Sequence, residues 1–161
     1  MSENEVKERI GKSLGRIPSG VAVLSTQQGS TKGAMLASWF QQVGFEPPMV
    51  SVAMKKGRAA QELLQSSEKF VLSILHTNQK DMLAHFGKGF EPGVDPFEGV
   101  ETETQTTGLP ILKHCLCFLE CQVRHIFEAG DHNIVVGEVL DAGMEEEGSP
   151  MVHVRRSGFH Y

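Results

Sequence analysis

The apolar positions of this chain fall into short runs between turn residues, and three segments repeat them at helical spacing. The first, residues 1–15, begins at a capping box formed by Ser2 and Glu5 and then carries an apolar residue at every fourth position. Two shorter helices are predicted at residues 58–65 and 78–86, where apolar side chains again share one helical face.

Six or seven other segments have the pattern of strands. The predicted strands are residues 20–26, 33–40, 49–54, 70–75, 111–127, 134–141 and 151–154. The first is apolar on both faces, which predicts a buried strand, whereas residues 49–54 alternate between two faces. Because the early strands are separated by turns and not by helices, the pattern favours an antiparallel barrel with peripheral helices over a doubly wound parallel sheet.

Residues 87–110 have no apolar period and are rich in glycine and proline. A segment of this length is too long for a plain connection, so we expect a loop that covers part of the barrel. No repeat or low-complexity tract divides the chain, and residues 1–161 are predicted to form a single domain.

Composition narrows the function classes. The chain has 161 residues, and its 15 basic and 20 acidic side chains give a formal net charge of −5, which argues against a dedicated nucleic-acid binder. No apolar run approaches the roughly 18 residues of a membrane span, and the acidic N-terminus has no apolar core of a secretory signal. We therefore expect a cytoplasmic protein with neither a nucleic-acid nor a membrane partner.

The three cysteines, Cys115, Cys117 and Cys121, lie close together in one predicted strand. On a strand they share one face, and we interpret them as small buried side chains in a reducing compartment. A zinc site is the minor alternative, because it requires a fourth ligand and a different spacing.

A basic turn, Lys55-Lys56-Gly57-Arg58, follows one predicted strand and opens a predicted helix. Cations at a helix N-terminus oppose the helix dipole, which favours negative charge there. A bound anion between them relieves this conflict, so the turn is a candidate phosphate site. The alternative is an ordinary solvated basic turn.

Two more segments are candidates for ligand contact. Residues 34–42 hold the only tryptophan, Trp39, beside small residues and amides, which suits a flat ligand with a polar edge; a core tryptophan in an ordinary strand is the alternative. The turn Gly130-Asp131-His132 presents either an imidazole to a pocket or a structural turn histidine. The other six histidines show no metal-ligand spacing and are interpreted as structural or exposed.

The order of these motifs along the chain resembles the flavin reductase-like, FMN-binding split-barrel family. The motifs that carry the resemblance are residues 20–23, 33–39, 45–48, 55–59, 70–75, 119–121 and 130–132. Residues 152–161 are similar to the flavin reductase domain at the C-terminus of cyanobacterial flavodiiron proteins. The resemblance spans residues 17–161, and it implies a free-standing version without flavodiiron modules or a rubredoxin site.

The resemblance implies a mainly β fold, a six-stranded antiparallel FMN-binding split barrel with a Greek-key element and flanking helices, assembled as a homodimer. It implies His132 as the candidate catalytic residue on the nicotinamide side of the flavin. The cofactor-binding residues that it implies are Ala37, Ser38, Trp39, Phe40, Gln41, Ser51, Lys55, Lys56 and Arg58. The chain departs from the family at Leu36 and at Gln42-Val43-Gly44, where many members carry hydroxyl side chains.

The implied activity is FMN-dependent NAD(P)H:flavin oxidoreductase, with FAD as a possible cofactor and NADH or NADPH as donor. Hydride passes from the nicotinamide to the flavin and electrons go onward to a flavin or a redox-protein acceptor. Two alternatives stay open: a non-enzymatic FMN-binding electron-transfer module, and an oxidase-type split barrel that uses another donor.

Overall fold

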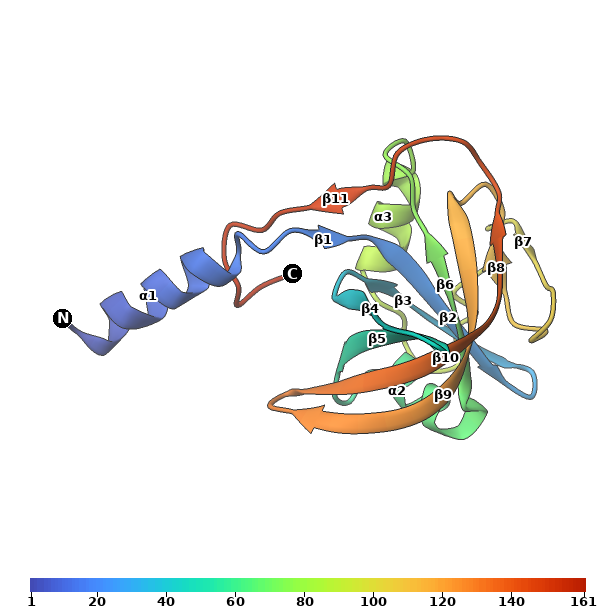
Figure 1. Cartoon of the computed structure of the whole chain (residues 1–161), viewed down its shortest axis with the longest axis horizontal. Helices are drawn as coiled ribbons and strands as arrows, with labels where there is room; N and C mark the ends of the chain where they lie inside the picture. The colour runs from blue at the N-terminus through green and yellow to red at the C-terminus, as the bar shows by residue number, and fades with distance from the viewer.

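The computed structural model describes all residues 1–161 and shows a mainly β fold with three helices (Figure 1). The helices are α1 (Glu3–Leu14), α2 (Ala59–Ser67) and α3 (Lys80–Gly87). The strands are β1 (Ser19–Gly20), β2 (Ala22–Gln28), β3 (Thr31–Ala37), β4 (Phe40–Phe45), β5 (Pro48–Lys55), β6 (Lys69–Ile74), β7 (Thr102–Glu103), β8 (Ile111–Leu112), β9 (Cys117–Ala129), β10 (His132–Met144) and β11 (Val152–His153).

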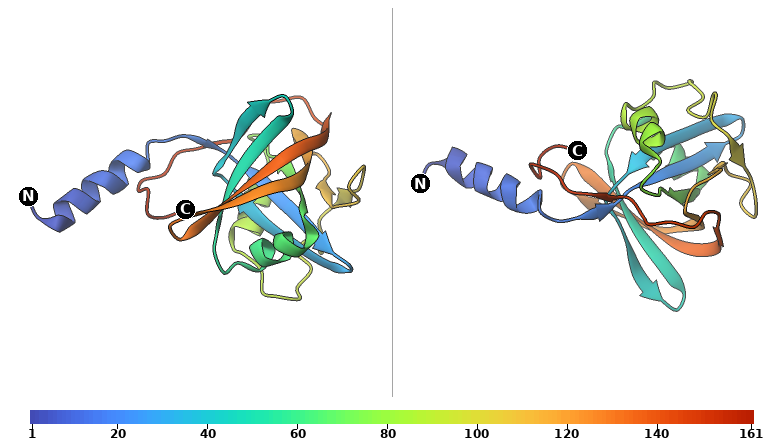
Figure 2. Two further views of the ribbon diagram at one scale, coloured as in Figure 1. Left: turned by 60° about the horizontal axis from the view of Figure 1, so that its bottom comes forward. Right: turned by 90° about the horizontal axis from the view of Figure 1, so that it is seen from above.

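Seven of these strands form one antiparallel sheet in the order β3-β2-β6-β9-β10-β5-β4. The sequence predicted an antiparallel barrel, and this is confirmed, but the sheet has seven strands and not six. It is not a closed barrel, because β3 and β4 are its two edges. Figure 2 shows the β4–β5 hairpin turning away from β2 and β3.

The two edge strands are consecutive in the sequence, and only Ser38 and Trp39 separate the end of β3 from the start of β4. This link spans at most about 10 Å, whereas the edges of a flat seven-stranded sheet lie about 29 Å apart. The sheet must therefore curl until its edges approach each other. We call this opening between β3 and β4 the seam.

The core has two parts, and strand β2 contributes to both. Val21 and Val23, just before and within β2, belong to one apolar cluster, whereas Ala22 and Leu24 belong to the other. All four side chains are at most 1% exposed. This confirms the prediction of a strand buried on both faces, and it explains why the strand is apolar at successive positions.

Helix α1 has the predicted boundaries but projects from the sheet (Figures 1 and 2). Its capping box is formed, since the Ser2 side chain accepts a hydrogen bond from Glu5 N. Gly11 is its only buried residue, and after β10 the chain returns along β1 and the end of α1. No helix of the structure has the length and apolar character needed to cross a membrane.

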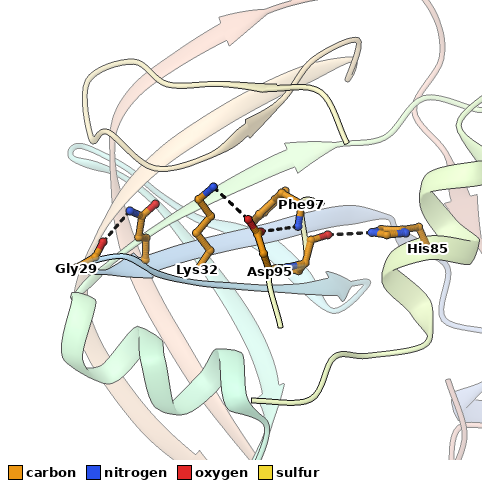
Figure 3. A network of polar contacts seen from close by, with 7 residues as sticks. Gly29, Lys32, His85, Asp95 and Phe97 are labelled. Atoms are coloured by element: carbon orange, nitrogen blue, oxygen red, sulfur yellow. Dashed lines mark hydrogen bonds and ion pairs between the residues drawn. The ribbon is translucent and has the colours of Figure 1, made fainter. Parts of the chain in front are cut away.

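The long segment at residues 87–110 packs against one of the two core clusters. Phe97 and Leu109 are buried in that cluster. Figure 3 shows how the segment is held: Lys32 of β3 pairs with Asp95 at 3.4 Å, and Asp95 also accepts a bond from Phe97 N. His85 of α3 hydrogen-bonds to the carbonyl of Pro96 at 2.9 Å in the same view.

The prediction of one long strand over residues 111–127 is wrong, because the chain breaks between β8 and β9. His114 has a positive φ of 62°, which ends the extended conformation. Cys115 therefore lies before β9 and packs in one core cluster, while Cys121 packs in the other. The three cysteines do not share a face, although all are free thiols and two are buried.

Candidate ligand site at the seam of the sheet

A cavity of about 460 Å³ lies beside the link that joins the two edges, and its walls come from this link, from β4, β5 and β10, from the end of α1 with β1, and from the tail residues Arg155 and Gly158. Its walls include five residues that the sequence singled out, which are Ser38, Trp39, Phe40, Gln41 and Ser51. The link that closes the seam is tied to β5, because the Trp39 carbonyl accepts a hydrogen bond from Ala53 N at 2.9 Å. We call this space the seam cavity.

Three rings meet at one side of the seam cavity. The Trp39 ring centroid lies 4.9 Å from that of His132 and 5.1 Å from that of Tyr161, both tilted. The Arg155 guanidinium lies over Trp39, with its carbon 4.8 Å from the ring centroid. Aromatic and cation–π contacts of this kind hold flat rings in a fixed orientation.

His132 is held between two polar neighbours. Its Nδ1 lies 2.7 Å from the Asp131 carboxylate, and its Nε2 hydrogen-bonds to the Tyr161 hydroxyl. A neutral imidazole with the proton on Nδ1 satisfies both bonds, since Nδ1 then donates and Nε2 accepts. The bond from His132 lowers the pKa of the exposed Asp131 carboxyl.

The basic turn lies next to the Gly-Asp-His turn. The Lys56 amide donates to the Asp131 carbonyl at 3.0 Å, and Lys55 pairs in register with His132 across β5 and β10. These long-range contacts bring together two motifs that are more than 70 residues apart in the sequence. The basic turn and the His132 imidazole therefore lie side by side where β5 ends and β10 begins.

No side chain caps the start of helix α2. Its N-cap residue is Arg58, whose side chain makes no capping hydrogen bond, in contrast to the complete capping box of α1. Gly57, just before it, has φ of +80°, and no atom lies within 4 Å of the position that a Cβ would take. The first turn of α2 thus offers free backbone N–H groups beside a cation, which suits an anion.

A second cavity of about 690 Å³ begins at this corner. Gly57, Arg58 and Ala59 line one side, and residues 88–94 of the covering segment line another. We call it the corner cavity. Arg58 belongs to its wall, while the Arg58 guanidinium carbon also lies 5.6 Å from the centroid of the Tyr161 ring.

The predicted residues do not all reach a cavity. Ala37 is buried, and His132 lines neither cavity. Lys55 and Lys56 are exposed and also line neither cavity; Lys56 instead pairs with Glu128 at 3.2 Å. The contact of Arg155 and Tyr161 with Trp39 was missed. The sequence showed them only as a polar tail, and the one available signal was the likeness of that tail to a family.

The comparisons with known proteins agree with this geometry. The profile of the family described as "Flavin reductase like domain" matches residues 14–160. Diflavin flavoprotein A 1 of Synechocystis sp. is 43% identical over 152 residues, which cover 93% of this chain and 26% of that protein. The chain therefore spans about a quarter of the length of the relatives that it matches.

Solved structures give the same result for the fold. The NADH:FAD oxidoreductase SgcE6 of Streptomyces globisporus superposes with a TM-score of 0.84 and 29% identity, covering 99% of this chain and 93% of that chain. The flavin reductase PheA2 superposes with a TM-score of 0.79 and 29% identity, covering 96% and 94%. Another structure of SgcE6, in complex with NAD and FAD fragments, has a TM-score of 0.82 at 28% identity, with coverage of 94% and 89%.

Tyr161 is the only tyrosine, so its titration can be followed alone. Partial burial, the largest effect, favours the neutral phenol and raises its pKa above the usual value of 10.0; the Arg58 and Arg155 charges oppose this rise, and the Asp131 charge adds to it. We expect the tyrosinate absorbance of the folded protein to appear at higher pH than in denaturant. The same midpoint in both states would show that the tail does not hold the ring at the site.

Proposed function

The chain belongs to the family of flavin reductase-like domains, and we propose on that premise that it is an FMN-dependent NAD(P)H:flavin oxidoreductase. The observation that carries the proposal is the uncapped, cationic start of α2 beside an aromatic seam. FMN has the matching chemistry, because it joins an anionic phosphate to a flat ring with a polar edge.

The corner at α2 fits the phosphate. Arg58 provides a guanidinium, and the free N–H groups of the first turn add a positive dipole end. The open space beside the Gly57 backbone permits close approach of phosphate oxygens. Lys55 and Lys56 carry further positive charge nearby, so they favour the anion by long-range attraction even though they line no cavity.

The seam cavity fits the ring. Ser38, Ser51 and Gln41 supply hydroxyl and amide groups for the polar edge, and Trp39 and Phe40 supply apolar surface. At about 460 Å³ its volume lies within the usual range for small-molecule sites. The corner cavity leaves room for a larger flavin, so FAD is the alternative cofactor.

When bound, FMN supplies a flavin N5 that accepts a hydride from C4 of NADH or NADPH. The protein's own residues orient the two rings and exclude water. His132 is the residue that we place on the nicotinamide side. Its ring is fixed by Asp131 and packs against Trp39, so it orients the donor by contact and transfers no proton.

Electrons then pass to an acceptor that is either a free flavin or a redox protein. The curated relatives are diflavin flavoproteins about four times the length of the matched segment, which supports a flavoprotein partner for this chain. A non-enzymatic FMN-binding electron-transfer module is the second candidate, and the same relatives support it.

We further propose a homodimer. Helix α1 projects from the sheet, and its Ile10 and Leu14 side chains are 46% and 40% exposed. Within its own chain this amphipathic helix contacts only the tail, so packing against a second copy would cover the apolar side chains that remain exposed. Light scattering that gives the mass of one 17.7 kDa chain would contradict this assembly.

Reduction of bound flavin is the direct test of the activity. The protein loaded with FMN is mixed anaerobically with NADH and, separately, with NADPH, and the visible absorbance of the oxidised flavin is followed. We expect rapid bleaching with at least one donor. Flavin that binds but stays oxidised with both donors would instead favour the non-enzymatic module.

Arg58→Ala tests the phosphate corner. Loss of a charge-assisted contact worth about 1.5–3 kcal/mol weakens FMN binding by roughly tenfold or more. The matched control is Arg124→Ala, which removes the same charge from an arginine that pairs with Glu138 on β9 and β10. FMN affinity, measured by quenching of flavin fluorescence, is expected to fall only in the first variant; equal affinities in both would remove Arg58 from the site.

A further inference from the structure

The tail, residues 152–161, runs from the sheet to the end of α1 and there turns back toward the sheet (Figure 1). Strand β11 pairs with β1, and the Arg155 and Gly158 amides donate to the carbonyls of Gly15 and Gly11 at the end of α1. The Arg155 guanidinium also donates to the His160 carbonyl at 3.2 Å, which folds the last residues back over Trp39.

Tyr161 lies close to one wall residue of each cavity. Its ring lies 5.1 Å from Trp39, which lines the seam cavity, and 5.6 Å from the Arg58 guanidinium carbon, which belongs to the corner cavity. Its hydroxyl hydrogen-bonds to His132. The three residues that it touches, Trp39, Arg58 and His132, are all candidate site residues.

Tyr161 covers His132 yet remains open to solvent itself. Only 12% of the His132 side chain is exposed, whereas Tyr161 is 58% exposed. The phenol hydroxyl occupies the Nε2 edge of the imidazole, and the two ring centroids lie 6.1 Å apart at 60°, so a ligand cannot hydrogen-bond to Nε2 while the phenol is in place. The phenol is held by one hydrogen bond and ring contacts at the surface, so a competing aromatic ligand can displace it at modest cost.

We propose that Tyr161 is a displaceable gate, whose ring fills the junction between Trp39 and Arg58 in the free protein and leaves when a ligand spans both cavities. The ligand is an aromatic ring joined to a phosphate, and its identity as a flavin rests on the proposed function. Displacement exposes His132 and joins the seam and corner cavities into one groove. The apparent affinity is therefore the intrinsic affinity multiplied by the fraction of molecules in which the gate is open.

The first test uses the ligand-free protein. Trp39 is the only tryptophan, so acrylamide quenching of its fluorescence reports directly on the cover that Tyr161 provides. We expect Tyr161→Ala to increase the quenching constant, and Tyr161→Phe, which keeps the ring and loses the hydroxyl, to give an intermediate value. An unchanged quenching constant in Tyr161→Ala would overturn the gate whether or not FMN binds.

The second test separates a gate from a residue that clamps the ligand. Removal of the competing ring and its hydrogen bond is expected to tighten FMN binding about tenfold in Tyr161→Ala. FMN is also expected to speed trypsin cleavage after Arg155 and Arg156 in the unmodified protein, detected by intact mass, because the displaced tail is accessible.

The opposite results contradict the proposal. Weaker FMN binding in Tyr161→Ala, or protection of the tail from trypsin by FMN, would show that Tyr161 closes over the ligand and helps to hold it. If neither protein binds FMN, the proposed function is wrong, and the gate is still judged by the quenching of Trp39. FMN binding therefore tests the proposed function, and the quenching of Trp39 tests the gate separately.

Discussion

The site depends on one constraint, the two-residue link between the edges of the sheet. Ser38 and Trp39 join β3 to β4, and these strands are separated by the whole width of the seven-stranded sheet. The sheet must curl to satisfy so short a link, and the curl opens a cavity with the link on its wall. Trp39 lies at the site because the chain crosses from one edge of the sheet to the other at this link.

Antiparallel pairing then brings the basic turn and His132 close to Trp39. The register of β5 with β10 sets Lys55 beside His132, and the turn after β5 leads directly into the uncapped start of α2. A cationic corner and an aromatic seam thus lie on either side of Tyr161. This arrangement matches a ring joined to a phosphate, which is the chemistry that the family membership supports.

Local features of the fold were readable from the sequence, and long-range ones were not. The Ser2–Glu5 box gave the start of α1, and the apolar run of β2 gave a strand buried on both faces. The apolar pattern does not change at His114, because the strand ends there through a single positive φ. The place of Tyr161 depends on tail contacts with α1, β1 and the seam, which no local pattern encodes.

The central claim is that the start of α2 binds the phosphate of the flavin. Comparing the affinities of FMN and riboflavin tests it most directly, since the two share one ring and differ only in the phosphate. The account predicts that FMN binds at least about tenfold more tightly at low ionic strength and that salt narrows the difference. Equal affinities at all salt concentrations would contradict it.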